Sequence, residues 1–132
     1  MKRRRRGSDE GTVAIEAALL LPVFLLALLG VIEFGAALWQ WNTMLLAVEQ
    51  AGRWAMINNS DSNLVADVEN QMQAVLPSAA VCTAPKPGQI CVNVSSSAGT
   101  PSTMTLTASY NFNLLALFGP FTLTSQGTVP LD

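Results

Sequence analysis

The most constraining feature of this sequence is an apolar run of 27 residues from Val13 to Trp39. The run contains two charged residues, Glu16 near its start and Glu33 near its end. As a helix rising about 1.5 Å per residue it would extend roughly 40 Å, whereas the hydrocarbon core of a bilayer is about 30 Å thick. The run therefore predicts a membrane-spanning helix, with Trp39 and Trp41 at the interface, where tryptophan is favoured.

Two other interpretations of this run stay open. A buried core helix would have to be enclosed by the remaining roughly 90 residues, which is a small number for so long an element. A cleaved secretory signal peptide normally has an apolar region of about 7 to 15 residues, shorter than this one. In that case the triplet Gly35-Ala36-Ala37 would be the signal-peptidase site, and a small secreted domain would be released.

Positive charge is concentrated at the N-terminus. Five basic residues at positions 2–6 precede the run and outweigh Asp9 and Glu10, whereas residues 12–132 carry two positive and seven negative groups. A nucleic-acid-binding arm normally works beside a basic domain, which is not present here, so we expect no nucleic-acid partner. The basic block instead favours a positive-inside signal, with the N-terminus cytoplasmic and the C-terminus extracytoplasmic.

The sequence offers little for catalysis. It has no histidine, which is the commonest general base and a common zinc ligand, and no phosphate loop or nucleophile triad is evident. We therefore expect no enzyme activity, no catalytic residue, no metal or cofactor, and no small-molecule substrate. Cys82 and Cys91 bracket a turn-rich loop on the predicted outward side, where an oxidising compartment favours a disulfide between them.

Helical periodicity continues beyond the predicted span. Apolar and small residues recur at spacings of three and four, which predicts that the first helix extends to about Ile57 with this stripe buried. The stripe consists of Trp41, Leu45, Val48, Gly52 and Ala55. A second amphipathic helix is predicted from Leu64 to a stop at Pro77. Glu49 and Arg53 have the i,i+4 spacing of an exposed ion pair.

The C-terminal part predicts β structure. Apolar and polar residues alternate from Thr103 to Phe112, and shorter alternating segments occur at 90–94 and 121–129. Three antiparallel strands packed on the outer half of the long helix would give a small α+β domain. The connection at 113–118 is unusually apolar. It either folds inward over the helices, which we favour, or forms an exposed contact with another subunit or a membrane.

Glu16 needs an explanation, because a carboxylate in hydrocarbon costs about 2.5 kcal/mol or more. A basic leader ends at Gly11, and Glu16 is the fifth residue after it. This arrangement resembles the processing site of type IV pilin-like proteins, in which prepilin peptidase cuts after the glycine and the glutamate guides assembly. Cleavage would give Thr12 a new α-amino group that Glu16 of the same or a neighbouring chain could pair with. Alternatively, Glu16 lies hydrated among the lipid headgroups.

Three further segments, Glu16–Pro22, Gly30–Gly35 and Ala51–Ala55, are similar to those of TadE-like proteins, the pseudopilins or minor pilins of tight-adherence pilus systems. The resemblance covers residues 11–55 and implies a pilin-like α+β fold. It also implies a structural or priming role in assembly of a tight-adherence (Tad/Flp) type IV pilus. Ala17, where many such pilins carry an aromatic residue, and the length of the chain favour a minor subunit.

The resemblance also implies a domain organisation and a set of partners. The chain would consist of a basic leader at 1–11, a transmembrane helix at 12–39 and an extracytoplasmic pilin-like domain at 40–132. It would lie in the cytoplasmic (inner) membrane as a single-pass protein and enter a cell-surface pilus. Its partners would be prepilin peptidase, major and other minor pilins, an inner-membrane assembly platform and the lipid bilayer. An alternative is a single-pass protein that keeps its leader and binds a partner through its ectodomain.

Overall fold

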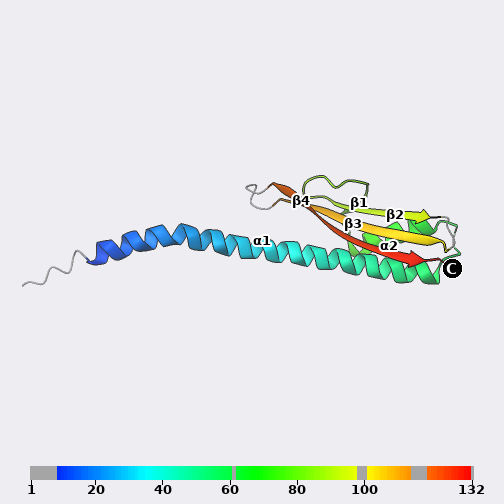
Figure 1. The fold of residues 1–132 in the computed structure, drawn as a ribbon, viewed down its shortest axis with the longest axis horizontal. Coiled ribbons are helices and arrows are strands. Elements are labelled where there is room, and N and C mark those ends of the chain that lie inside the picture. The colour runs from blue at the N-terminus through cyan, green and yellow to red at the C-terminus, as the bar shows by residue number, and fades with distance from the viewer. Residues whose placement is uncertain (1–8, 61, 98–100, 114–118, 132) are drawn as a thin grey trace, which may run out of the picture. The chain divides into compact units, whose positions relative to one another are not determined.

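The computed structural model describes residues 9–60, 62–97, 101–113 and 119–131. These parts form two helices and a sheet (Figure 1). In chain order the elements are α1 (Asp9–Ile57), α2 (Leu64–Val75), β1 (Ala79–Val81), β2 (Ile90–Ser97), β3 (Thr103–Asn113) and β4 (Pro120–Pro130). The chain divides into two compact units, Met1–Ala36 and Ala37–Asp132, and α1 contributes residues to both. The fold class is α+β with a long N-terminal apolar helix.

The predicted end of the first helix at Ile57 is confirmed, as is the second helix. Helix α2 ends at Val75, and the amide of Leu76, the residue before Pro77, still donates to the carbonyl of Met72 at 2.9 Å. Proline has no backbone N–H and disfavours helical conformation in the residue before it, which explains why the helix stops here.

The sheet has four strands in the order β1-β2-β3-β4. Strands β2, β3 and β4 pair antiparallel, which confirms the three predicted strands. The prediction of a purely antiparallel, three-stranded sheet is wrong, because β1 adds a fourth strand that pairs parallel with β2. With three residues, β1 is too short to produce a recognisable alternation.

A disulfide fastens this short strand to the sheet. Cys82 follows β1 directly and is bonded to Cys91 in β2, with 5.2 Å between the two Cα atoms. The pairing is the one expected from the sequence. The amide of Cys82 also donates to the carbonyl of Val92 at 3.1 Å. Both bonds join β1 to β2 at the point where the parallel pairing ends.

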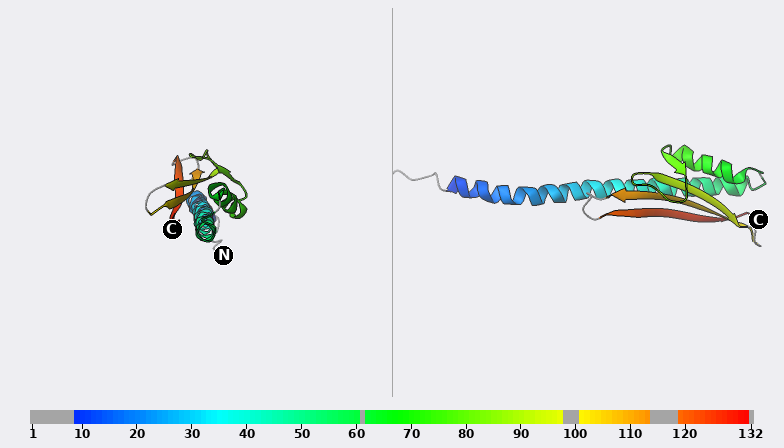
Figure 2. Two further views of the ribbon diagram at one scale, coloured as in Figure 1. Left: turned by 90° about the vertical axis from the view of Figure 1, so that its right-hand side faces the viewer. Right: turned by 90° about the horizontal axis from the view of Figure 1, so that it is seen from above.

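Within residues 37–132, α2 and the second half of α1 cover the same face of the sheet (Figure 2). The core between these layers is made of apolar side chains from α1, from α2 and from the sheet. Its fully buried members include Met44, Ala47, Val68, Met72, Val92, Met104 and Leu106. The apolar positions of the alternating segment 103–112 thus face the helices, while its threonines face outward.

The stripe of α1 that meets the core differs in part from the predicted one. Val48, Gly52 and Ala55 are buried as expected, but Trp41 is 44% exposed and Leu45 is 50% exposed. Their places are taken by Met44, Ala47 and Ala51. The small side chains of Ala47 and Ala51 let the helix approach the sheet closely, while Met44 fills space in the core and Trp41 and Leu45 lie on the flank.

Helix α1 approaches strand β4 closely at two glycines. A Cβ atom on Gly127 would lie 2.8 Å from Cγ1 of Val48, and one on Gly52 would lie 3.1 Å from Cγ2 of Val129. Real Cβ contacts are essentially never as short as 2.8 Å. The strand therefore requires glycine at position 127 if Val48 is to pack on its backbone.

We predict that Gly127→Ala destabilises the domain by about 1–3 kcal/mol, because the added methyl group overpacks the contact with Val48. Denaturant unfolding of the full chain in detergent, followed by tryptophan fluorescence, measures the change. Thr128→Ala, an exposed neighbour in the same strand, is the control and should change the free energy of unfolding far less. Equal stability of Gly127→Ala and the unmodified protein would contradict the account.

Reduction of the disulfide should loosen β1 before the rest of the sheet. For so short a loop the bond contributes about 2 to 3 kcal/mol. Amide hydrogen exchange of the reduced chain should accelerate at Ala79–Val81, while amides of β3, which pairs on both sides, stay protected. Uniform acceleration across β1 and β3 would show that the disulfide stabilises the domain as a whole.

Candidate membrane-embedded and processing segment

The predicted processing site lies at the start of α1. The helix begins at Asp9, so the Gly11–Thr12 peptide bond falls in its first turn, and both residues are exposed. Cleavage by a protease requires the helix to unwind locally. Helix ends fray most easily, so this bond is in the part of α1 where local unwinding is least costly.

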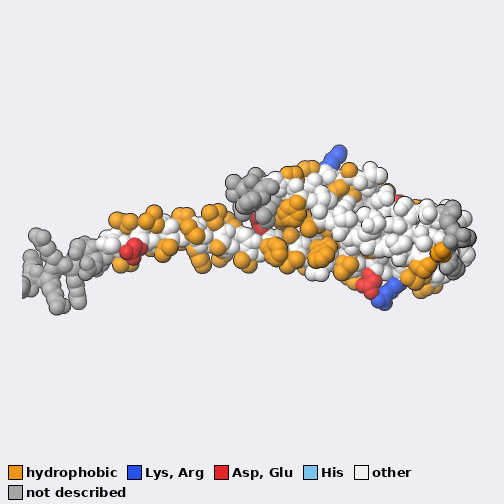
Figure 3. Space-filling view, in the orientation of Figure 1, with side chains coloured by type: hydrophobic (Ala, Val, Ile, Leu, Met, Phe, Trp, Pro, Cys, Tyr) orange, Lys and Arg blue, Asp and Glu red, His pale blue; other side chains and the backbone are white. Residues whose placement is uncertain are grey.

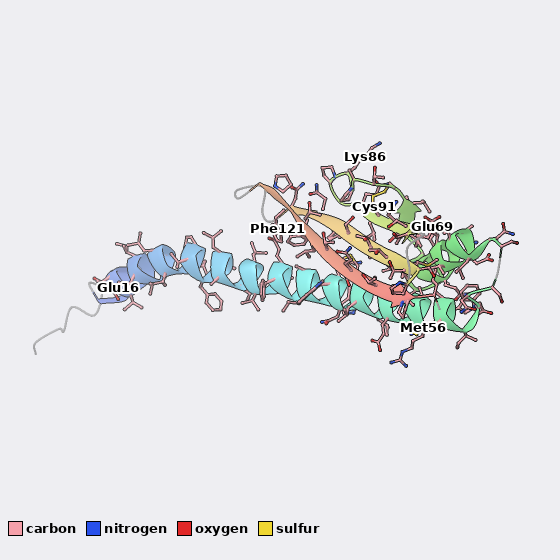
Figure 4. The ribbon with its side chains drawn as sticks, turned by 45° about the vertical axis from the view of Figure 1, so that its right-hand side comes forward. Glu16, Met56, Glu69, Lys86, Cys91 and Phe121 are labelled. Carbon is pink, nitrogen blue, oxygen red and sulfur yellow. A yellow bond between two sulfur atoms is a disulfide. The ribbon has the colours of Figure 1, made fainter. Side chains whose placement is uncertain are left out.

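Glu16 lies about one turn beyond Thr12 on the exposed surface of α1 (Figure 4). The i,i+4 spacing places these two residues on the same side of the helix. In the part of the chain that the structure describes, Glu16 forms no salt bridge; the ion pair found there joins Arg53 to Glu49, further along α1. That pair is exposed and has the spacing predicted from the sequence.

The segment that follows Glu16 is exposed on every side. From Gly11 to Leu29 every residue is classed as exposed, although most are large and apolar. Apolar side chains line this part of the helix in the space-filling view (Figure 3). A helix that is apolar all round is normally buried in protein or in lipid, and the chain itself does not bury this one. The core-helix interpretation is therefore wrong.

By length and composition, this helix could cross a membrane, and none of its most apolar 18-residue stretch is buried. The same features also occur in signal sequences. Trp39 ends the apolar run and Trp41 lies two residues beyond it; both are exposed, which is compatible with a place at a membrane interface. The described residues thus contain a candidate membrane span within Gly11–Ile57.

Residues 11–53 match the family of TadE-like proteins. The resemblance noted in the sequence is thereby confirmed for this segment, which we call the TadE-like segment. No curated protein and no solved structure matches the chain. The TadE-like segment begins at Gly11 and contains Thr12, Glu16 and the whole apolar run, whereas α2 and the sheet lie outside it.

The two ends of the TadE-like segment have different environments in this structure. Its first part is the exposed apolar helix, and its last part supplies Met44, Ala47 and Ala51 to the domain core. Among the described residues, no group of three or more His, Cys, Asp or Glu side chains is placed to hold a metal. The described part of the segment offers apolar surface for burial, and its carboxylates can form ion pairs, as Glu49 does with Arg53.

A groove between α1 and β4 was missed by sequence reasoning. It is lined by Leu45, Val48 and Met56 from α1 and by Gln126–Val129 from β4. The signal that could have revealed it is a pair of glycines, Gly52 and Gly127, where the two elements meet closely. Because these glycines are 75 positions apart, nothing local in the sequence connects them.

We predict that Leu25→Arg combined with Leu28→Arg removes the protein from the membrane. Each arginine near the middle of a span costs about 2.5–3.5 kcal/mol on insertion scales. Alkaline extraction of membranes should leave the unmodified chain in the pellet and release the double variant. Gln50→Arg, an exposed change beyond the apolar run, is the control and should stay in the pellet. Retention of the double variant would contradict the assignment of a span.

Proposed function

We propose that this protein is a minor pilin or pseudopilin, acting as a structural or priming subunit in assembly of a tight-adherence (Tad/Flp) type IV pilus. The observation that carries the proposal is the apolar helix within the TadE-like segment, every residue of which is exposed from Gly11 to Leu29. Such a helix requires lipid or other helices around it. Assembly of a filament would exchange the first environment for the second.

The proposed topology follows from the distribution of charge. The basic residues at 2–6 would stay in the cytoplasm, and the apolar helix would cross the cytoplasmic (inner) membrane once. The α+β domain of residues 37–132 would then lie on the extracytoplasmic side. A disulfide between Cys82 and Cys91 fits that side, because oxidising compartments preserve such bonds.

Processing by prepilin peptidase is the first proposed step. A cut between Gly11 and Thr12 removes the basic leader and makes Thr12 the new start of α1. Glu16 then lies close to the new α-amino group and to the unsatisfied backbone N–H groups of the helix start. Both the positive end of the helix and the ammonium group stabilise a carboxylate there.

Assembly is the second proposed step. A lone Glu16 in hydrocarbon costs about 2.5 kcal/mol or more, so the acid favours any arrangement that gives it a cationic partner. The Thr12 amine of a neighbouring subunit is such a partner, and pairing with it would fix the axial register of the two helices. The partners in this step are major and other minor pilins, with an inner-membrane assembly platform. The protein itself would act by association, without catalysis, cofactor or nucleic acid.

A minor role fits the size of the domain. Residues 37–132 form a folded unit with its own core of two helical segments and four strands. The tight-adherence pilins that the sequence resembles include very short major subunits, and a chain with this folded domain differs from them, which favours the minor role. The alternative of a partner-binding membrane protein needs the leader to be kept, and the alternative of a secreted domain needs α1 to be cut near its middle.

N-terminal sequencing of the protein isolated from membranes tests the processing step. We expect a mature chain that begins at Thr12. A chain that begins at Met1 would favour the membrane protein with a partner-binding ectodomain. A chain that begins near Leu38 would favour the secreted domain, because signal peptidase would then have removed the apolar run.

Glu16→Gln tests the assembly step. The variant keeps the size of the side chain but loses its charge, so the mature chain should reach the membrane while the number of pili falls by about tenfold, because the cost of the unpaired acid no longer favours pairing of the helices. Glu49→Gln is the matched control, because it removes another exposed carboxylate from α1. Equal numbers of pili in both variants, counted by electron microscopy, would refute a guiding role for Glu16.

A further inference from the structure

Strand β4 forms one edge of the sheet, so one of its long sides has no neighbouring strand among the described residues (Figure 2). It has 11 residues, carries no charged side chain and pairs with β3 without a bulge. The opposite edge is different: β1 has three residues, and the Gln73 side chain donates to the carbonyl of Ala79 at 3.2 Å. Short strands, charges and bulges normally protect exposed edges from further pairing. The edge of β4 has none of these protections.

The backbone hydrogen bonds determine which groups of β4 point away from the sheet. The amide of Leu131, directly after β4, donates to the carbonyl of Ser102, directly before β3, at 2.9 Å. The pairing of the two strands continues from there in one unbroken register. In a strand, the N–H and C=O groups of successive residues point to opposite sides. Odd-numbered residues of β4 therefore bond to β3, and even-numbered residues point to the open edge.

Two prolines delimit this open edge. Pro120 and Pro130 are both even-numbered, so their nitrogen atoms, which carry no hydrogen, lie on the open side and remove no bond between β3 and β4. Successive outward amides are about 6.6–6.8 Å apart, twice the rise per residue of a strand. Another extended polypeptide carries its carbonyl groups at the same spacing. The edge presents four such amides, those of Thr122, Thr124, Gln126 and Thr128.

The groove between α1 and β4 lies beside this edge, within residues 37–132, and has a volume of about 430 Å³. Its apolar lining includes Leu45 and Met56, which are 50% and 52% exposed. Figure 4 shows Met56 near the C-terminal end of β4. The charged residues of the lining, Glu49 and Arg53, are paired with each other. An apolar side chain can therefore enter the groove without leaving a buried charge unpaired.

The two faces of the edge specify the side chains of an added strand. Such side chains alternate between the face toward α1, where they meet the apolar groove, and the outer face. On the outer face they lie beside Thr124, Gln126 and Thr128, which are exposed, polar and uncharged. Hydroxyl-bearing residues pair well with threonine across strands. The complement of the edge is an extended, uncharged segment of about seven residues, in which apolar and hydroxyl-bearing residues alternate.

We propose that β4 binds such a segment, supplied by a different subunit of the pilus, as a fifth strand of the sheet. The inference rests on the proposed function, because a minor subunit has other subunits, rather than copies of itself, as its neighbours. Hydrogen bonds to the outward amides supply affinity, and the groove selects the side chains. Neither a lipid nor a small molecule offers the regular row of acceptors that this edge requires.

Photocrosslinking of the full chain in piliated cells tests the contact. Leu45 is replaced by p-benzoylphenylalanine, the cells are irradiated, and the adducts are mapped by mass spectrometry. We expect an adduct to an uncharged, alternating segment of a different pilus subunit. Leu46 is the control position, because it is 47% exposed but does not line the groove. The probe at Leu46 should give at least about tenfold less of this adduct, since its side chain lies outside the contact.

Thr124→Pro tests the backbone contact in the same experiment. The variant removes an outward amide and places a ring on the open edge, but it removes no hydrogen bond between β3 and β4. The adduct from position 45 should fall by about tenfold, because strand addition depends on main-chain hydrogen bonds. Thr124→Ala is the matched control: it keeps the amide and should change the yield less than about twofold. An intact Cys82–Cys91 disulfide and unchanged protease resistance establish that each variant is folded.

The site of the adduct decides the question even if Thr124→Pro does not fold. An adduct from position 45 to lipid, to a second copy of this chain or to a protein outside the pilus would overturn the proposal. The absence of any adduct, equal adducts from positions 45 and 46, or equal yields from folded Thr124→Pro and Thr124→Ala would do the same.

The proposed function is judged separately, by the effect of Glu16→Gln on the number of pili. Pili that depend on Glu16 but give no adduct from the groove would refute the added strand alone. Pili that are indifferent to Glu16 would refute the proposed function.

Discussion

The structure depends on one constraint: the apolar first half of α1 must be surrounded by lipid or by other apolar helices. The first half of α1 exposes large apolar side chains on all sides, and the described residues of the chain do not cover them. Water does not stabilise such a surface, but lipid and other apolar helices do. The proposed roles of the neighbouring residues depend on this constraint: the basic block at 2–6 would set the direction of insertion, Gly11 would precede the cut, and Glu16 lies near the edge of the apolar run.

The second half of the same helix is packed against the sheet of its own domain. Beyond Ala37 it packs on the sheet through small residues, and at Gly127 it rests on the strand backbone itself. This close approach leaves larger side chains such as Leu45 on the flank, where they form the wall of a groove. One continuous helix thus has an environment outside the chain for its first part and a folded domain for its second.

The periodicity of the sequence was sufficient to predict those helices and strands that are long and regularly patterned. The end of α1 at Ile57, helix α2 and strands β2 to β4 follow from such patterns. Strand β1 did not, because three residues show no period and each of them pairs in parallel with a residue eleven positions further along the chain. The predicted buried stripe of α1 was partly wrong. It included the large residues Trp41 and Leu45, which are exposed, whereas Ala47 and Ala51 are the residues buried against the sheet. The groove needs two glycines in separate elements, which no local pattern connects.

The central claim is that the apolar half of α1 leaves lipid and enters a packed array of helices. A fluorophore at Leu25→Cys, within the exposed apolar stretch, reports this change directly. The account predicts strong quenching by lipid-borne quenchers in membranes. In sheared filaments it predicts no quenching by lipid-borne or by water-soluble quenchers. Quenching by water-soluble reagents in filaments, or absence of the labelled chain from filaments, would contradict the claim.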